Sequence, residues 1–222
     1  MNKEKIEEIR KIIADLRVVN YNEENIETDT TFLGLKEGNY YLNNGNKMRR
    51  ESVVRRSGCA DAVAMFAITL EKEILLVIQP RAALPTDDKI DIELPAGYIE
   101  EGEEPSIAAM RELNEETGYV AQDITIIDSY YPSLGYSGEK IYIALAIGCE
   151  KKGEQHLDKD EFVSYIKVTI KEFKYLLDND YILDATARLA YYRTLEYLTN
   201  NQMLSMVGDN FEEKKEEIEK ED

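Results

Sequence analysis

Three glutamates, Glu112, Glu115 and Glu116, stand at the spacing i, i+3 and i+4, and Arg111 precedes them. On a helix this spacing places all three carboxylates on one face. Two unit charges about 5 Å apart repel each other by about 3 kcal/mol at an effective dielectric constant of about 20, so the group needs a compensating cation. Hard divalent cations with oxygen ligands, above all Mg²⁺, meet this need. The alternative is an ordinary solvated acidic helix face, which is the usual meaning of a run of charges.

The residues around the glutamates predict the helix that would carry them. Pro105 suits the first turn of a helix, and Gly118 suits the position just past its end, where φ is positive. We therefore predict a helix over residues 105–117. The face opposite the glutamates would carry the apolar side chains of Ile107, Met110 and Leu113.

The glutamates belong to a longer pattern over residues 97–119, which read GYIEEGEEPSIAAMRELNEETGY. This stretch resembles the Nudix box, and every fixed position of that motif is matched. The matched positions are Gly97, Glu103, Arg111, Glu112, Leu113, Glu115, Glu116, Gly118 and Tyr119. The resemblance implies a loop–helix–loop that binds Mg²⁺, with Mn²⁺ as an alternative metal. It also implies hydrolysis of a nucleoside diphosphate linked to another group.

The sequence outside the box resembles the ADP-ribose pyrophosphatase branch of the Nudix superfamily over about residues 48–190. Residues 93–97 match its Glu-Leu-Pro-Ala-Gly, and residues 79–81 resemble its Gln-Tyr-Arg. Residues 133–139 resemble its Ser-Pro-Gly-x-x-x-Glu loop, although Leu134 stands where proline is usual. The fold that this resemblance implies is of the α/β class. It is the Nudix α/β/α sandwich with a mixed sheet, to which an N-terminal helix and strands for dimerisation are added.

The resemblance also implies roles for individual residues. The implied metal ligands are Ala96, through its backbone carbonyl, and Glu112, Glu115 and Glu116. The implied catalytic residues are Glu139, as general base or water-positioning group, Glu115, and Arg111, which would brace the box together with Glu103. The implied substrate contacts are Arg81, which would meet the diphosphate, Glu93 and Arg56.

The implied chemistry fits these residue types. A diphosphate linkage is anionic and repels hydroxide; Mg²⁺ neutralises its oxygens and lowers the pKa of bound water, and a positioned carboxylate completes proton transfer. The expected reaction is Mg²⁺-dependent hydrolysis of ADP-ribose to AMP and ribose 5-phosphate. Three alternatives stay open. They are hydrolysis of another nucleoside diphosphate sugar, a non-catalytic module that senses ADP-ribose, and a structural acidic dimer in which the box is a coincidence.

The composition limits the partners. The chain has 222 residues, 27 basic and 45 acidic, with a net charge of −18. This charge disfavours nucleic acid and anionic membranes, so a nucleoside diphosphate-linked small molecule is the expected partner. No apolar run reaches about 18 residues and the N-terminus has no apolar signal core, so a cytoplasmic protein is expected. Cys59 and Cys149 are expected as buried free thiols, and the single histidine, His156, as an exposed loop residue.

We predict three regions along the chain. Residues 1–58 would form a helix and strands for dimerisation, residues 59–207 the Nudix hydrolase domain, and residues 208–222 a charged, flexible tail. In the hydrolase domain, strands are predicted at residues 60–70, 74–79, 92–94, 124–131, 140–149 and 162–168, and helices at 170–177 and 183–198.

The first region shows weaker patterns. Apolar residues at helical spacing predict a helix over residues 3–17, and the Asn- and Glu-rich residues 20–27 read as a loop. Short apolar patches at 32–35 and 40–42 are separated by Gly38, and the Asn44-Gly45 pair predicts a hairpin turn before a strand at 48–55. Because these elements are too small to hold a core alone, a homodimer is expected.

Overall fold

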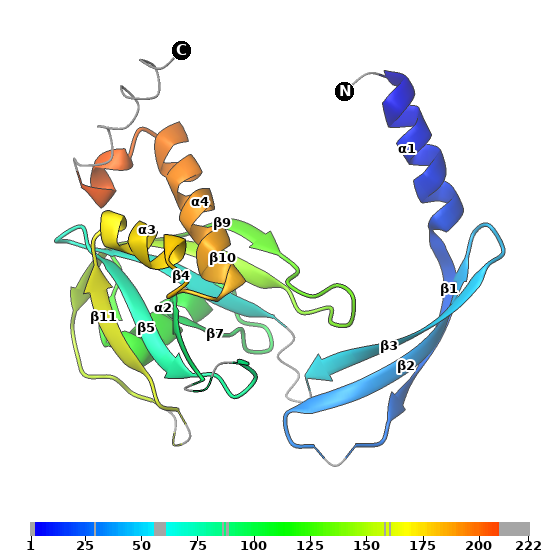
Figure 1. The fold of residues 1–222 in the computed structure, drawn as a ribbon, viewed down its shortest axis with the longest axis horizontal. Helices are drawn as coiled ribbons and strands as arrows, with labels where there is room; N and C mark the ends of the chain where they lie inside the picture. The colour runs from blue at the N-terminus through cyan, green and yellow to red at the C-terminus, as the bar shows by residue number, and fades with distance from the viewer. Residues whose placement is uncertain are drawn as a thin grey trace. The chain divides into compact units, whose positions relative to one another are not determined.

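The computed structural model describes residues 3–28, 30–55, 61–85, 87, 89–157, 159 and 161–208. Its contacts divide the chain into two compact units. The first consists of Met1–Ala60 and Ser133–Glu139, and the second of Asp61–Pro132 and Lys140–Asp222 (Figure 1).

The second unit is built around a mixed sheet. Its strands are β4 (Ala62–Thr69), β5 (Ile74–Pro80), β6 (Ile90–Glu93), β7 (Ala96–Tyr98), β8 (Tyr119–Val120), β9 (Asp123–Tyr130), β10 (Ile141–Lys151) and β11 (Ser164–Val168). Its helices are α2 (Pro105–Thr117), α3 (Ile170–Asp178), α4 (Ala185–Asn200) and the short η1 (Leu204–Val207). In the described part of the chain the strand order is β11-β5-β4-β10-β8, with β6 beside β5, β7 beside β4 and β9 beside β10. Strands β4 and β10 run parallel, and the other recorded pairings in this sheet are antiparallel.

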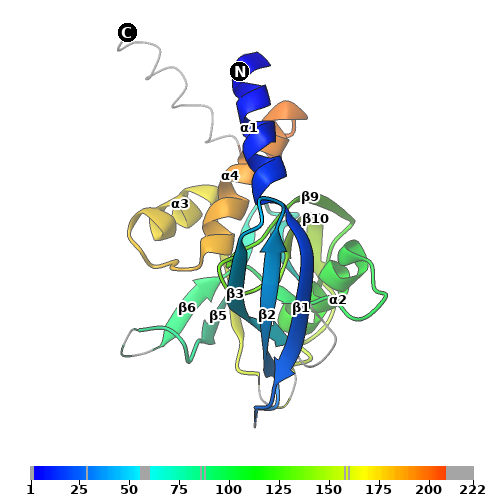
Figure 2. The same ribbon diagram turned by 90° about the vertical axis from the view of Figure 1, so that its right-hand side faces the viewer.

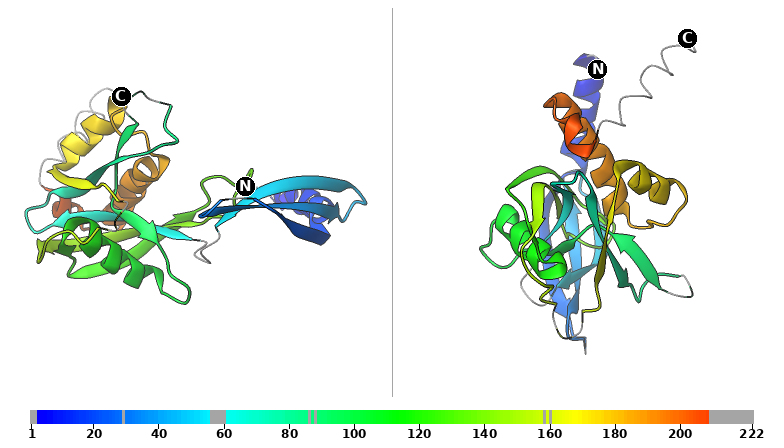
Figure 3. Two further views of the ribbon diagram at one scale, coloured as in Figure 1. Left: turned by 90° about the horizontal axis from the view of Figure 1, so that it is seen from below. Right: turned by 90° about the vertical axis from the view of Figure 1, so that its left-hand side faces the viewer.

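Successive side chains of the central strands point to opposite faces of the sheet, and this alternation divides the core into two layers. On β4, Phe66 and Ile68 face the cluster that includes Phe173 of α3 and residues of α4. The neighbouring Met65 and Ala67 face the opposite cluster, which includes Leu113 of α2. Figures 1 and 3 show α2 on one side of the sheet and α3 with α4 on the other. The expected α/β/α sandwich is confirmed, and burial of both faces explains why β4 and β5 read as continuous apolar runs.

Helix α2 begins and ends where the sequence predicts, and Gly118 has the predicted positive φ of 68°. The prediction of its apolar face is wrong, because Ile107 is 57% exposed and Met110 is 39% exposed. The buried residues of α2 are Ala108, Ala109, Leu113, Glu116 and Thr117. Two alanines allow the helix to approach the sheet closely, and this approach takes Glu116 into the interior along with them.

The first unit contains α1 (Lys3–Leu16) and the strands β1 (Val18–Ile26), β2 (Leu33–Leu42) and β3 (Lys47–Arg55), which form an antiparallel sheet in chain order (Figure 2). The predicted loop at 20–27 is therefore wrong, since these residues pair with β2 over almost their whole length. The predicted interruption at Gly38 is also wrong. A β-carbon there would lie 2.9 Å from Glu23 Cγ, so the glycine permits close strand pairing instead of breaking β2.

The predicted hairpin turn at Asn44-Gly45 is confirmed. Leu42 N–H donates to Asn46 O at 2.8 Å, and Gly45 adopts a positive φ of 85°. The Ser133–Glu139 segment joins this unit through β3, because Val53 N–H donates to Tyr136 O at 2.7 Å. Both recorded clusters of buried apolar residues lie in the second unit, so the described part of the first unit has no such cluster of its own.

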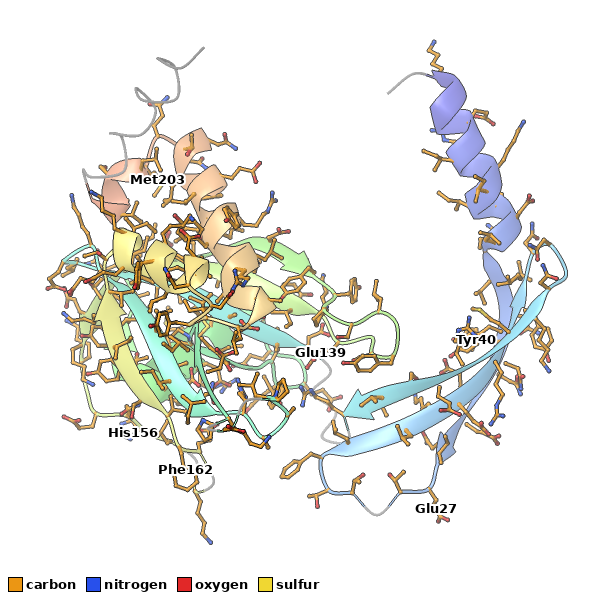
Figure 4. The ribbon with its side chains drawn as sticks, viewed as in Figure 1. Glu27, Tyr40, Glu139, His156, Phe162 and Met203 are labelled. Atoms are coloured by element: carbon orange, nitrogen blue, oxygen red, sulfur yellow. The ribbon has the colours of Figure 1, made fainter. Side chains whose placement is uncertain are left out.

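The remaining predictions have mixed outcomes. The predicted bounds of the strands from residues 60–70 onward, and those of the helices at 170–177 and 183–198, differ from the observed bounds by no more than two residues. His156 is exposed (Figure 4), as predicted. Cys149 is a buried free cysteine, and burial raises the pKa of its thiol to about 12. Cys59 and the tail from residue 209 lie outside the described residues. None of the described helices is long and apolar enough to cross a membrane.

Candidate active site

The site is centred on the contact between β7 and α2. A β-carbon built on Gly97 would lie 1.9 Å from Cδ of Glu112 and 2.2 Å from one of its carboxylate oxygens. The Glu112 carboxylate therefore occupies the volume that any other residue at position 97 would fill. This contact is the physical reason why the pattern begins with glycine, since only a residue without a side chain lets the carboxylate reach the strand.

Ala96 places its backbone polar groups toward the same helix. In an antiparallel ladder, alternate residues exchange hydrogen bonds with the opposite strand. Pro95 and Ile99 both form backbone hydrogen bonds to residues of the β4 segment. Ala96 occupies the alternate kind of position, so its N–H and C=O point away from β4. Its N–H donates to Glu116 Oε2 at 2.9 Å. The carbonyl of Ala96 points to the same side, because N–H and C=O of one strand residue share a direction.

Arg111 connects most of the acidic residues of the box. Its Nη1 donates to Glu112 Oε1 at 2.7 Å and to Glu115 Oε2 at 3.1 Å. Its Nε and Nη2 donate to the two oxygens of Glu103 at 3.1 and 2.9 Å. A further bond of 2.8 Å joins Nη2 to the carbonyl of Tyr98 on β7. Arg111 thus holds β7 and the loop before α2 against the helix.

The carboxylates have perturbed proton affinities. Glu116 is only 4% exposed, and its desolvation, opposed in part by the Ala96 N–H and reinforced by the charge of Glu112, raises the pKa of Glu116 to about 8. Desolvation also raises the pKa of Glu112, against the effect of its hydrogen bond from Arg111. Arg111 lowers the pKa of Glu103 by hydrogen bonding, so this carboxylate stays ionised. The site therefore holds more acidic groups than it can ionise in the absence of an additional cation.

These residues fit a divalent cation in their chemistry. The donors are carboxylate oxygens and one backbone carbonyl, which are the ligands of hard cations such as Mg²⁺. Among the described residues, no three His, Cys, Asp or Glu side chains converge in a ready metal-binding group, and Arg111 donates hydrogen bonds to both Glu112 and Glu115.

The predicted substrate residues Arg81 and Glu93 lie together. Arg81 donates from Nε and Nη2 to the two Glu93 oxygens at 2.7 and 2.5 Å, which makes a bidentate pair between the residue after β5 and the last residue of β6. These bonds raise the pKa of Arg81, and the charge of Glu116 acts in the same direction. The charge of Arg81 in turn acts to lower the pKa of Glu116. The side chain of Arg81 is 47% exposed, whereas that of Glu93 is 9% exposed, so Arg81 can meet a solute while Glu93 orients it. Arg56 lies outside the described residues.

Comparison with known proteins agrees with this geometry. The NUDIX domain family matches residues 60–188, a span that contains β7, α2 and the Arg81–Glu93 pair. The chain belongs to the Nudix family. It is 37% identical to the methanol dehydrogenase activator of Bacillus methanolicus over 175 residues, 77% of this chain and 91% of that protein. It is 37% identical to the ADP-ribose pyrophosphatase of Bacillus subtilis over 164 residues, 73% of this chain and 83% of that protein.

A solved structure shares the Nudix fold of this chain. The crystal structure of an ADP compounds hydrolase superposes with a TM-score of 0.70 at 20% identity, and the match covers 86% of this chain and 97% of the other. At this level of identity the likeness shows the fold.

One acidic residue near the Nudix site was not singled out by the sequence. The charge of Glu161, in the segment before β11, raises the pKa of both Glu112 and Glu116. Glu161 is one acid in a charged stretch that sequence patterns assign to a loop. Its effect on the site arises from the tertiary fold, which no local sequence pattern reveals.

Glu139, the expected general base, lies in the first unit (Figure 4). Nε and Nη2 of Arg55 both donate to its Oε1, at 2.8 and 2.5 Å. The side chains of Arg55 and Glu139 are 25% and 21% exposed. The pair holds the Ser133–Glu139 segment against the end of β3. The role of Glu139 in proton transfer stays a prediction.

Proposed function

We propose that this Nudix protein hydrolyses the diphosphate linkage of ADP-ribose, producing AMP and ribose 5-phosphate, with Mg²⁺ as the metal and Mn²⁺ as an alternative. One observation carries the proposal. The desolvated Glu116, with its pKa raised to about 8, lies against Ala96 and near Glu112, where an added cation would relieve the surplus of acidic charge. The names of its relatives support the substrate, because two ADP-ribose pyrophosphatases, of Bacillus subtilis and Saccharomyces cerevisiae, match 72–73% of the chain.

The proposed metal ligands are Glu112, Glu116 and the carbonyl of Ala96, with Glu115 as a further carboxylate. When bound, Mg²⁺ would neutralise the diphosphate oxygens and make water a stronger acid. Glu116 must lose its proton to serve as a ligand, so its raised pKa ties metal affinity to pH. Arg111 would hold Glu112 and Glu115 in place through its hydrogen bonds.

The proposed substrate contact is Arg81. A guanidinium presents paired donors to phosphate oxygens, and the two bonds from Arg81 to Glu93 fix the plane of that group. A diphosphate that takes one of these donors would compete with Glu93 for it. Arg56 and Glu139 complete the proposed set, the first for the substrate and the second for proton transfer.

The test is an assay of the purified protein with ADP-ribose in Mg²⁺ and in EDTA. AMP should appear in Mg²⁺ alone, and Glu116→Gln should abolish most of the turnover while the fold is retained. A panel of ADP-glucose, another nucleoside diphosphate sugar and a nucleoside triphosphate measures the preference. Much faster hydrolysis of the triphosphate would contradict the assignment. Binding of ADP-ribose without turnover would point instead to a sensing module.

The Bacillus methanolicus relative favours a second candidate function. That protein is named a methanol dehydrogenase activator and is as similar to this chain as the Bacillus subtilis pyrophosphatase is. If this chain activates such an enzyme, its addition should raise the rate of methanol oxidation by a methanol dehydrogenase. Glu116→Gln is the matched control, because activation through hydrolysis requires the carboxylate site and activation by binding alone does not.

We further propose that residues 1–58 serve dimerisation of a hydrolase domain formed by residues 59–207. The support is the exposure of apolar side chains in the first unit. Val19 is 52% exposed, Tyr21 61% and Phe32 76%. A three-stranded sheet with such faces gains stability by covering them, and a second copy of the chain would do so.

A further inference from the structure

The carbonyl groups at the end of α2 are satisfied by one segment that begins at the last residue of β10. The last carbonyls of a helix have no partner within the helix and need donors from elsewhere. His156 N–H donates to Glu115 O at 2.8 Å, and Lys151 Nζ donates to Thr117 O at 2.8 Å. The backbone N–H groups of residues 152 and 153 donate to the carbonyl of Gly118 at 2.9 and 3.2 Å. Residues 151–156 therefore cap the end of α2 that carries Glu115 and Glu116.

Gln155 makes the remaining contact, to the carbonyl of Glu116 itself. Its Nε2 donates to Glu116 O at 2.5 Å and to Val163 O at 3.2 Å. A primary amide has two N–H donors, so these two bonds use the full donor capacity of the group. Val163 is 7% exposed and directly precedes β11. Gln155 thus links the end of α2 to the start of β11 and closes the segment between them.

The capping segment sits tightly against α2. A β-carbon on Gly118 would lie 2.2 Å from the carbonyl oxygen of Gly153, so the two backbones approach as closely as glycine allows. Lys151 is further held by two aromatic rings, with Nζ 4.6 Å from the centroid of Tyr165 and 5.6 Å from that of Tyr119. The segment therefore has one well-defined position relative to the helix.

The segment that Gln155 closes also carries Glu161, two residues before Val163. Figure 4 labels His156 and Phe162, which both belong to this segment. The charge of Glu161 raises the pKa of both Glu112 and Glu116. The end of α2, which carries Glu116, is thus joined to the start of β11 by one uncharged side-chain amide.

We propose that Gln155 is a positioning residue of the acidic site, which fixes the end of α2 that carries Glu116 relative to the start of β11 through the carbonyls of Glu116 and Val163. The proposal rests on the proposed metal-dependent function of the same site. Gln155 touches neither substrate nor metal in this assignment. Its effect on affinity arises because a ligand set held in the binding geometry has less conformational freedom to lose when a cation binds.

The test compares Gln155→Ala and Gln155→Glu with the wild type, with Gln122→Ala as a control that removes the same atoms at an exposed position. Direct Mn²⁺ titration should show affinity weaker by about tenfold in Gln155→Ala, the lower end of the range for residues that support metal ligands. Gln155→Glu keeps the shape but replaces both donors with acceptors that face two carbonyls, so its loss should be at least as large. At saturating metal, kcat for ADP-ribose should recover toward the wild-type value while the metal requirement stays shifted.

A second measurement needs no metal. In EDTA, hydrogen exchange of the His156 amide, which donates to Glu115 O, should be faster in Gln155→Ala than in the wild type or Gln122→Ala. Unchanged exchange together with Mn²⁺ affinity within twofold of the wild type would overturn the proposal, as would an equal loss in Gln122→Ala. If the wild type neither binds Mn²⁺ nor cleaves ADP-ribose, the proposed function fails. The exchange arm then decides alone whether Gln155 fixes the end of α2.

Discussion

The carboxylate of Glu112 lies where a side chain of residue 97 would begin, so any β-carbon at Gly97 would overlap it. We predict that Gly97→Ala displaces this carboxylate and lowers kcat for ADP-ribose by about 100-fold, the cost of misplacing a reacting group by about 1 Å. The Mg²⁺ concentration for half-maximal activity should rise in parallel. Both values come from a metal titration of initial rates.

Gly153→Ala is the control for this variant. A β-carbon at Gly153 meets no atom within 4 Å, and the backbone there has no positive φ. Its kinetics should match those of the wild type. Retention of wild-type metal dependence by Gly97→Ala would show that Glu112 is not a ligand.

The raised pKa of Glu116 predicts that the stability of the metal-free protein depends on pH. Its pKa is raised from about 4.5 to about 8 on folding, so between these values the native state holds a proton that the unfolded chain has lost. Stability due to this group is complete below pH 4.5 and declines by up to about 1.4 kcal/mol per pH unit as pH rises toward 8. Glu116→Gln should remove this part of the decline, measured by denaturant unfolding in EDTA from pH 5 to 9. Parallel curves for the two proteins would show that Glu116 is ionised throughout.

We predict that replacing Arg111 by lysine lowers the free energy of unfolding. Arg111→Lys keeps the charge but loses the planar fork that reaches Glu103, Glu112 and the Tyr98 carbonyl together. Hydrogen bonds to charged groups contribute roughly 1.5–3 kcal/mol each, so we expect a loss of about 2 kcal/mol in unfolding free energy. Arg193→Lys is the comparison, since Arg193 forms more exposed pairs with Asp128 and Glu196. Equal losses in both variants would contradict a special role for Arg111.

Glu139 should separate binding from chemistry. If it is the general base, Glu139→Gln should lower kcat by about 10²–10⁴ while KM changes little. The Arg55–Glu139 pair offers a different cause, since loss of either residue would free the Ser133–Glu139 segment from β3. Arg55→Met tests this cause. If it matches Glu139→Gln in kcat and the double variant adds nothing, Glu139 acts through the pair and not as a base.

The exposed face of β1 predicts self-association. Light scattering at micromolar concentration should give twice the 25.5 kDa mass of the chain. Val19→Asp introduces a charge at a side chain that is 52% exposed and should shift the mass toward the monomer. Glu24→Gln, on the same strand and also exposed, should leave the mass unchanged. A monomeric wild type would refute the proposed dimer.

The sequence by itself determined the features that depend on neighbours along the chain. Pro105 and Gly118 set the bounds of α2 because one fits a helix start and the other a positive φ beyond its end. The carboxylate spacing followed from helical geometry, and the buried strands followed from their apolar runs. For the same reason the sequence failed at β1, whose polar residues become a strand through pairing with β2, a partner that local propensity does not reveal.

Only the tertiary structure decided which groups share the site. The spacing of the glutamates is the same whichever face of α2 packs on the sheet, and Ala108 and Ala109 decided that it is the face that buries Glu116. The sequence likewise could not show that Gln155 bonds to the carbonyl of Glu116, 39 residues away, or that the charge of Glu161 raises the pKa of Glu116. Burial and contacts between distant segments arise when the chain closes on itself, and these set the proton affinities on which the proposed chemistry depends.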